Sequence, residues 1–542
     1  MTIPTDNSPL ENPSEWEPAE NGKVVRAAGV VGMATFLSRI FGFLRDMVVA
    51  AYFGAGMVTD AFFVSFRIPN LLRRLLAEGS LTVAFVPVFT DYLQNKSKRD
   101  ALDLANVVFT ALSIVLVAVS LIGVLLSPVI VAIMAPGFIK EPAQYDLAVF
   151  LTRLMFPYIF FISLVALCMG ILNSLRHFAA PAFSPVLLNI SMIAATLLLQ
   201  DFFAEPIYAL AVGVMIGGVL QLALQWPFLR RLGVKLKADF NFRHPGLKRI
   251  GLLMLPAVFG GAVYQINILI GTILASLLPS GSVSYLYYAD RLVELPLGVF
   301  GIAVGTAALP SFSRLVSRGE AEELKETIAF SLRLILFVTI PATVALLILG
   351  EPIISVLFQR GAFVLSDTLR TNEALIAYTL GLWAFSAIRI VVSAFHALQD
   401  MRTPMRAAVV ALLVNAILSL ILMFPLKHAG LALATSIASA VNVIMLYIIL
   451  RRRIGVFLKD DFFRSCGKIM VSSLAMWGVI FLLGLFFPWK PHGDAFERIT
   501  FLCLAITGGL GGFLLMAYCL KCEELKSLSA LVRKRKPKRG NC

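Results

Sequence analysis

Long apolar runs separated by short polar stretches follow one another along almost the whole chain. Each run has at least 20 residues, the length that a helix needs to cross about 30 Å of hydrocarbon. Fourteen runs can be drawn, at 24–54, 59–94, 101–134, 145–173, 181–200, 206–229, 249–278, 283–317, 325–358, 372–398, 404–425, 429–450, 465–487 and 499–520. The pattern predicts an all-α polytopic membrane protein with about 14 transmembrane helices.

The polar stretches between the runs alternate in charge. One set is basic and includes 96–99, 230–249, 451–453 and the C-terminal tail, whereas the other set is short or acidic, as in "GAGMV" and "QDFFAEP". Cytoplasmic loops of membrane proteins carry the excess of Lys and Arg. We therefore expect the basic loops to be cytoplasmic and, with an even number of spans, both termini to be cytoplasmic as well.

The composition agrees with a chain that mostly faces lipid or its own interior. Of the 542 residues, 59% are hydrophobic and 15% are charged, against about 25% charged in soluble domains. The net charge of +15 is explained by the basic loops and does not indicate a nucleic-acid partner. The six cysteines are scattered and form no disulfide or metal pattern, so neither a metal nor a cofactor is expected.

Landmarks of the first half of the chain recur in the second half at a nearly constant offset. The offset is 310 − 87 = 223 for Pro87 and Pro310, and it is the same or differs by one for three further pairs: Pro181 with Pro404, Gly233 with Gly455, and Arg67 with Arg291. A duplicated unit with six spans keeps the same orientation in both copies. Parallel repeats of this kind are found in transporters whose halves move about a central site.

The repeat divides the chain into six expected parts. Two pseudo-symmetric six-helix lobes are joined by a basic cytoplasmic linker and followed by two further helices. The parts are a disordered acidic tail (1–22), the N-lobe (23–233), the linker (234–248), the C-lobe (249–456), helices 13 and 14 (457–520) and a basic cytoplasmic tail (521–542).

Several charged residues lie inside the expected spans, where each costs about 2.5–3.5 kcal/mol and by default lines an interior or a cavity. In the first span, Ser38 and Arg45, like Arg39 and Asp46, are seven positions apart and so share a helix face. The second and eighth spans and the tenth span hold the other charges: Asp60, Arg67, Arg73, Arg74, Glu78, Asp290, Arg291, Glu294 and Arg389.

The arginines among these charges fall at two depths. A rise of 1.5 Å per residue puts Arg45, Arg67 and Arg291 roughly 12–13 Å, and Arg39 and Arg73 roughly 21–22 Å, from the outer ends of their spans. Since the guanidinium fork suits phosphate oxygens and stays charged, we expect a central cationic cavity that binds an anion. Alternatively, each arginine only neutralises a nearby acid, in the pairs Arg45–Asp46, Arg74–Glu78 and Arg291–Asp290.

Two other functional classes make different demands on the sequence. A membrane glycosyltransferase or polymerase would need a catalytic acid in a large outer loop, and the largest one, 359–371, holds only Asp367 inside it. A cation-coupled drug exporter would use carboxylates such as Asp46 or Asp60 against a cationic substrate. No catalytic motif is present, and the excess of buried cations favours a transporter of an anion over both alternatives.

Two long stretches resemble a known family. Residues 37–89, "LSRIFGFLRDMVVAAYFGAGMVTDAFFVSFRIPNLLRRLLAEGSLTVAFVPVF", and residues 280–315, "SGSVSYLYYADRLVELPLGVFGIAVGTAALPSFSRL", are similar to the signature segments of the MurJ (MviN) family of lipid II flippases, and "HAGLALA" at 428–434 agrees. The resemblance extends from about residue 24 to 520. The family belongs to the superfamily of multidrug, oligosaccharidyl-lipid and polysaccharide exporters.

The resemblance implies a multi-pass protein of the bacterial inner membrane. It would move the undecaprenyl-pyrophosphate-linked peptidoglycan precursor to the outer leaflet for cell wall synthesis, with helices 13 and 14 forming a groove for the lipid tail. Lipid II is the implied partner, and the resemblance also allows cell wall synthesis proteins as further partners. The family's functional residues fall on Ser38, Arg39, Arg45, Asp46, Asp60, Arg73, Glu78 and Arg291, whereas Arg67 rests on the depth argument alone.

The energy source is left open between membrane potential and a proton gradient. Some members of the family bind sodium through acidic residues of spans 7, 11 and 12. In this sequence those spans offer Gln265, Asn267, Asn415 and Asn442 and no buried acid. A sodium site of that kind is therefore not expected here.

Overall fold

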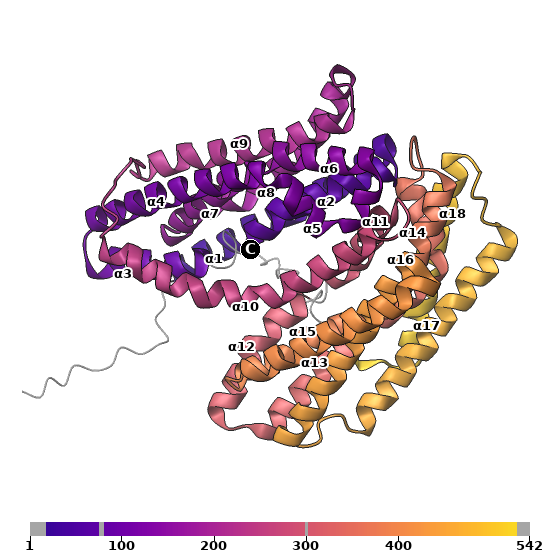
Figure 1. Ribbon diagram of the computed structural model, residues 1–542. Coiled ribbons are helices and arrows are strands. Elements are labelled where there is room, and N and C mark those ends of the chain that lie inside the picture. Colours follow the sequence, from indigo (N-terminus) through magenta and orange to yellow (C-terminus); the bar gives the residue numbers. More distant parts are fainter. Residues whose placement is uncertain (1–17, 75–80, 299–301, 528–542) are drawn as a thin grey trace, which may run out of the picture. The chain divides into compact units, whose positions relative to one another are not determined.

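The computed structural model describes residues 18–74, 81–298 and 302–527 of the chain. The described residues are mostly helical and include no strand (Figure 1). The α-helices are α1 (Pro18–Phe53), α2 (Met57–Leu72), α3 (Thr82–Asn95), α4 (Lys98–Leu125), α5 (Ser127–Met134), α6 (Pro142–Met155), α7 (Tyr158–Ser174), α8 (Ala179–Leu199), α9 (Ile207–Arg231), α10 (Pro245–Ser276), α11 (Ser282–Pro296), α12 (Ile302–Arg318), α13 (Ala321–Phe358), α14 (Leu365–Thr379), α15 (Leu382–Ala397), α16 (Arg402–Ile454), α17 (Asp460–Phe486) and α18 (Ala495–Cys519). Glu78, most of the expected acidic tail and most of the basic tail lie outside the described residues.

Within the described part of the chain, nine helical segments are long and apolar enough to cross a membrane. They are Lys98–Leu125, Pro142–Ser174, Ala179–Phe202, Ile207–Arg231, Ala321–Phe358, Leu365–Ala397, Arg402–Ile454, Asp460–Phe486 and Ala495–Cys519. The seventh covers two expected spans, because the backbone of α16 leaves helical geometry at Lys427 (φ 49°, ψ −130°). The expected runs 24–54, 59–94, 249–278 and 283–317 are also mainly helical where the structure describes them. An all-α membrane fold is thus confirmed.

The duplication inferred from the sequence is repeated in the helix boundaries. The α1 and α10 helices end at Phe53 and Ser276, so that 276 − 53 = 223. The same difference separates the starts of α4 and α13, at Lys98 and Ala321, and likewise the ends of α7 and α15 and of α9 and α16. Equivalent sequence landmarks therefore mark equivalent places in two copies of one helical pattern.

The chain forms two compact units whose limits fall inside helices. Unit 1 comprises 1–45, 72–122 and 155–258, and unit 2 comprises 46–71, 123–154 and 259–542. The boundary within α1 lies between Arg45 and Asp46, so these neighbours belong to different units. The first span therefore contributes residues to both units.

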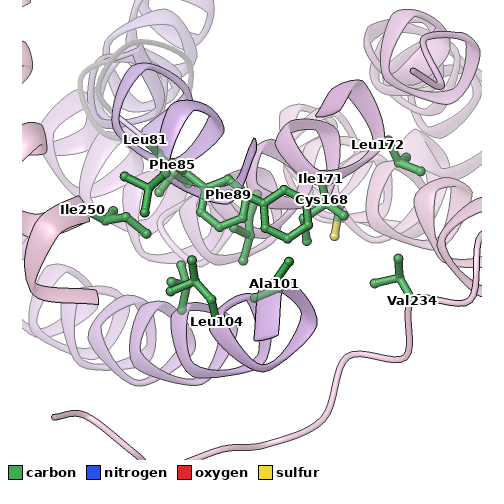
Figure 2. Packing of buried hydrophobic residues seen from close by; sticks show 14 of the residues in the cluster. Leu81, Phe85, Phe89, Ala101, Leu104, Cys168, Ile171, Leu172, Val234 and Ile250 are labelled. Atoms are coloured by element: carbon green, nitrogen blue, oxygen red, sulfur yellow. The ribbon is translucent and has the colours of Figure 1, made fainter. Parts of the chain in front are cut away.

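The core of unit 1 forms where α3, α4 and α7 meet. Phe85 and Phe89 of α3, and Leu81 just before it, follow one another at intervals of four and therefore lie on one face of the helix. All three are at least 97% buried, and the rings of Phe85 and Phe89 stack with centroids 5.1 Å apart. Figure 2 shows them facing Leu104 of α4 and Ile171 of α7. Burial of these side chains holds the three helices together.

The α8 and α9 helices of unit 1 pack closely because α9 presents glycine to its neighbour. A Cβ atom at Gly213 would lie 2.8 Å from the Cβ of Ala195 and 2.9 Å from the Cα of Met192. A Cβ at Gly217 would lie 2.5 Å from the Oγ of Ser191. Small residues at such a crossing let two backbones approach, as is common between membrane helices.

Among the described residues of unit 2, two apolar clusters share α13. One joins α12, α13, α15 and α16 and includes Phe312, Ile335 and Phe395. The other joins α13 to α17 and α18 and includes Phe337 and Phe513, with ring centroids 5.2 Å apart. The α17 and α18 helices also pack on each other, as Figure 1 shows at the yellow end of the chain. The two last helices are thus attached to α13.

We expect Gly213→Ala to lower the thermal unfolding temperature of the detergent-purified protein by several degrees. The added methyl meets the backbone of α8, and overpacking of this kind costs about 1–3 kcal/mol. Gly251→Ala, on an exposed face of α10 with no atom within 4 Å of its Cβ, is the matched control and should leave the temperature unchanged or slightly higher. Equal temperatures for both variants would contradict close α8–α9 packing.

Candidate functional site

Two of the predicted residues of α1, Ser38 and Arg45, contact α8 in unit 1. The side chain of Asn189, on α8, lies over Gly42, which has no Cβ to obstruct it. Its Oδ1 accepts a hydrogen bond from Arg45 Nη1 at 3.0 Å, and its Nδ2 donates to the carbonyl of Ser38 at 3.2 Å. Ser38 and Arg45 therefore lie on one face, as their spacing predicts. Arg39 is exposed.

Arg291 of α11 lies in a group of polar side chains in unit 2. Its Nε is 3.4 Å from Asp46 Oδ2, its Nη1 is 3.0 Å from Glu294 Oε2, and its Nη2 donates to Tyr287 Oη at 3.0 Å. The Tyr287 ring also lies 4.8 Å below the guanidinium and its hydroxyl donates to Asp46 at 3.1 Å. Arg291 is thus shared between two carboxylates rather than paired with one.

The expected pairing of Arg291 with Asp290 is not among the ion pairs of the described residues. Consecutive residues of a helix point in different directions, whereas residues three apart are neighbours, which explains the contact with Glu294. Asp290 is exposed and interacts electrostatically with Arg67 instead.

Arg67 of α2 donates from Nη1 to the hydroxyl of Thr272 on α10. Both residues belong to unit 2, and Arg67 is near enough to Arg291 for their charges to repel each other. Thr272 is a neutral acceptor, so the hydrogen bond leaves the positive charge of Arg67 in place. The structure therefore brings together two of the three arginines that were expected at one depth.

Asp60 of α2 is 2% exposed and its carboxylate accepts hydrogen bonds from the start of α11. The donors are the backbone N–H groups of Gly281 and Ser284, at 2.7 and 2.8 Å, and the Ser284 hydroxyl, at 2.5 Å. A carboxylate at a helix N-terminus satisfies orphan N–H groups and complements the helix dipole. The contacts of Asp60 thus fasten α2 to α11.

The α2–α11 contact joins positions that are equivalent in the sequence repeat. Asp60 corresponds to Ser284, since 284 − 60 = 224, and Phe63 corresponds to Tyr287, since 287 − 63 = 224. The rings of Phe63 and Tyr287 stack with centroids 3.8 Å apart. Contacts between equivalent positions are what a two-fold axis generates, so the duplicated helices meet at their own pseudo-symmetry axis.

The two arginines expected at the deeper level, Arg39 and Arg73, are exposed and half-buried, respectively. Arg74, just after the end of α2, is exposed. Glu78, the expected partner of Arg74, lies outside the described residues. Arg389 is exposed on α15, with its Cβ 3.7 Å from the position that a Cβ of Gly305 would take.

The three spans considered for sodium hold a neutral polar cluster. Asn415 Nδ2 donates to Asn267 Oδ1 at 2.8 Å, and the hydroxyls of Ser419 and Thr435 donate to Asn415 Oδ1 at 3.5 and 3.4 Å. Among the described residues, no three His, Cys, Asp or Glu side chains are grouped so that they could hold a metal ion. Both amide oxygens, Asn267 Oδ1 and Asn415 Oδ1, thus accept hydrogen bonds from amide or hydroxyl donors of the same cluster.

The neutral partners of the charges were not predicted from the sequence. Asn189, Thr272, Tyr287 and Ser284 each contact a predicted residue from another helix. Only Asn189 left a usable signal, because an amide in the apolar stretch "VLLNISM" has to find a partner within the membrane.

Comparisons with known proteins agree on one family. A family model described as "Lipid II flippase MurJ" matches residues 49–496. A probable lipid II flippase MurJ of Buchnera aphidicola subsp. Acyrthosiphon pisum is 40% identical over 453 residues, which cover 84% of this chain and 89% of the relative.

Solved structures give the same result. A lipid II flippase MurJ in an inward closed conformation matches with a TM-score of 0.75 and 29% identity over 90% of this chain and 99% of that structure. An inward-facing multidrug resistance transporter of the MATE family, in the MOP superfamily, matches with a TM-score of 0.65 at 14% identity, covering 80% of this chain and 99% of that one. The second likeness concerns the fold alone.

We expect substitutions at Asp60 to destabilise the protein in a graded order. Asp60→Ala removes all three hydrogen bonds and leaves N–H groups of α11 unsatisfied, which costs about 1–3 kcal/mol. Asp60→Asn keeps one acceptor oxygen, and Ser284→Ala removes only a hydroxyl, so both should cost less. Thermal unfolding in detergent measures the order, with Asp103→Ala, an exposed acid of α4, as the control. An Asp60→Ala protein as stable as this control would exclude the capping role.

Proposed function

The chain belongs to the lipid II flippase family MurJ, and from this premise we propose that it carries lipid II across the bacterial inner membrane. The cargo is the undecaprenyl-pyrophosphate-linked peptidoglycan precursor, which moves from the cytoplasmic to the outer leaflet by alternating access. The protein is a multi-pass transporter that serves cell wall synthesis and is not an enzyme.

The pyrophosphate is bound by the arginines of α1, α2 and α11. Arg45 and Arg67 donate to the neutral acceptors Asn189 and Thr272. These hydrogen bonds orient the two guanidinium groups, which is the observation that carries the proposal. Planar guanidinium groups bind phosphate oxygens in bidentate fashion. Ser38, Arg39, Asp46, Asp60, Arg73 and Glu78 complete the proposed substrate-binding set, with Arg74, Asp290, Glu294 and Arg389 in secondary cavity and gating roles.

Release of the cargo requires that its phosphate be exchanged for a protein carboxylate, and the surroundings of Arg291 allow this exchange. Its guanidinium is shared between Asp46 and Glu294, and 36% of its side chain is exposed. A phosphate oxygen can replace one carboxylate while the other keeps the side chain in place. When the cavity changes shape, the carboxylates compete for Arg291 again and displace the diphosphate, so binding stays reversible.

The α2–α11 contact is the proposed closure on the outer side. Asp60 fastens the start of α11, and the Phe63–Tyr287 stack excludes water beside it. Opening to the outer leaflet has to break these contacts together, since they lie on the same pair of helices. The energy source for this step is left open between membrane potential and a proton gradient.

The proposed moving bodies are the lobes 23–233 and 249–456, joined by the linker 234–248. The helices of 457–520 hold the prenyl tail in the membrane while the head group crosses. The basic loops support a cytoplasmic location of both termini, and the tails 1–22 and 521–542 would then extend into the cytoplasm. Cell wall synthesis proteins are proposed as further partners.

Removing a proposed phosphate ligand should impair translocation without unfolding the protein. We expect Arg45→Ala and Arg291→Ala each to lower lipid II translocation about 10- to 100-fold, since a charge-assisted hydrogen bond contributes about 1.5–3 kcal/mol. Arg291→Lys should recover only part of it, because an ammonium lacks the planar fork. The measurement is the fraction of lipid II that is accessible at the outer leaflet of cells depleted of the native protein.

The matched control is Arg318→Ala, at the exposed end of α12, where the arginine is 4.0 Å from Glu320. This variant should translocate normally. Normal translocation by Arg45→Ala and Arg291→Ala, at equal protein levels, would rule out these arginines as phosphate ligands. The cargo would then bind at another site.

Sodium should not be required at the Asn267–Asn415 cluster, since neutral oxygens that hydrogen-bond one another bind a small cation weakly without a carboxylate. We expect translocation in inverted vesicles to be unchanged when potassium replaces sodium at a fixed membrane potential. A loss that millimolar sodium restores in the wild type and not in Asn415→Leu would show a sodium site in this cluster.

A further inference from the structure

The hairpin that joins α17 to α18 encloses a pocket of about 240 Å³. The hairpin follows the end of α17 at Phe486, whereas the basic segment 451–459 precedes the start of α17 at Asp460. Five of the pocket's lining residues are aromatic and three are charged. The lining residues are Phe486, Phe487, Pro488, Trp489, Lys490, Phe496, Glu497, Arg498, Thr500, Phe501 and Leu504.

The hairpin is held against the end of α13 by hydrogen bonds on both sides of the pocket. Trp489 Nε1 donates to Glu351 Oε1 at 2.9 Å, and Arg498 Nη1 donates to Ser355 Oγ at 3.2 Å. The two acceptors are one helical turn apart on α13. The Trp489 ring also packs on Phe501, with centroids 5.4 Å apart. The pocket is therefore preformed, because its walls are fixed by contacts outside it.

The rim of the pocket is strongly apolar and exposed. Phe486 and Phe496 are 79% and 80% exposed, and Phe487 is 57% exposed. Aromatic side chains at the ends of membrane helices lie at the level of the lipid head groups. The pocket thus opens where acyl chains meet head groups, so its occupant comes from the membrane.

The charges at the pocket favour an anion. Glu497 is balanced by Lys490, at 3.3 Å. Arg498 has no carboxylate partner among the described residues, and its buried Nε has no hydrogen-bond partner there. Arg360 lies close by, donating to the carbonyls of Val356 and Leu357 at the end of α13. Partial burial and the charge of Arg498 both lower the pKa of Arg360.

We propose that this pocket binds an anionic phospholipid, with the phosphate on Arg498 and Lys490 and the start of an acyl chain among the aromatic side chains. Two neighbouring guanidinium groups that repel each other are stabilised by a counter-ion, and a lipid phosphate provides one at this depth. The bound lipid joins α17 and α18 to α13. In the orientation proposed above, it comes from the outer leaflet.

A soluble anion does not account for the pocket. Inorganic phosphate has no apolar part to cover five aromatic rings, and it gains little from an opening towards acyl chains. A purely apolar chain would leave Arg498 Nε without an acceptor. The combination of an orphan donor with an apolar wall therefore selects an amphiphile.

Native mass spectrometry of the full-length protein in detergent tests the site, with dioleoyl-phosphatidylglycerol added at a fixed ratio. We expect the double variant Lys490→Gln/Arg498→Gln to retain about 10-fold less of one bound phosphatidylglycerol than the wild type. The control, Lys459→Gln/Arg464→Gln, removes two exposed cations at the other end of α17 and should retain it fully. Leu504→Trp fills the pocket without changing its charge and should also lose the lipid.

Thermal unfolding of each variant shows whether it is folded, and the wild type should gain stability from phosphatidylglycerol where Leu504→Trp does not. Equal retention by the wild type and both pocket variants would overturn the proposal. Displacement by inorganic phosphate would indicate a soluble-anion site, and selective retention of undecaprenyl diphosphate would indicate a site for the transported lipid. Either result would contradict the assignment of a phospholipid to this pocket. Translocation need not change in any of these outcomes, so failure here is separate from failure of the proposed function.

Discussion

A charged group inside a membrane protein must keep its charge available and still be stabilised in a medium of low dielectric constant. Pairing each arginine with its own carboxylate would stabilise it and abolish its attraction for an anion. In this chain Arg45 and Arg67 hydrogen-bond to the neutral residues Asn189 and Thr272. A neutral acceptor orients the guanidinium group without itself neutralising the charge. In the proposed mechanism, phosphate binding depends on this orientation.

The charge of Arg291 is stabilised differently, because its guanidinium contacts two acids and a tyrosine. A cation shared in this way can exchange one partner for a phosphate without being left unpaired, which keeps the cost of each exchange low. Transport needs such near-balanced exchanges, since a cargo held by unopposed cations would be released too slowly. In the proposed mechanism, the acids near the arginines therefore belong to the transport site, although they carry the same sign of charge as the cargo.

In the proposed mechanism, the duplication supplies the contact that closes the outer side. Asp60 binds the start of α11 at the residue that corresponds to its own position in the second half, and Phe63 stacks on its counterpart Tyr287. The two copies have diverged at these positions: one supplies a carboxylate where the other supplies a hydroxyl and N–H groups. Two carboxylates at these equivalent positions would repel each other, so the divergence of the two copies is what makes this contact attractive. The sequence repeat thus becomes a contact between unlike residues at equivalent positions.

The sequence by itself determined the all-helical membrane fold, the internal duplication and which arginines lie within the apolar helices. These follow from hydropathy and spacing, which are local along the chain. Only the tertiary structure decided that Asp60 caps α11, that Arg291 is shared between Asp46 and Glu294, and that Asn189 and Thr272 hold the other arginines. The partners in these contacts, apart from Glu294, are 144 or more residues away. The low dielectric of the membrane requires that each buried charge has a partner, but it does not specify which distant polar residue the packing of the helices brings to it.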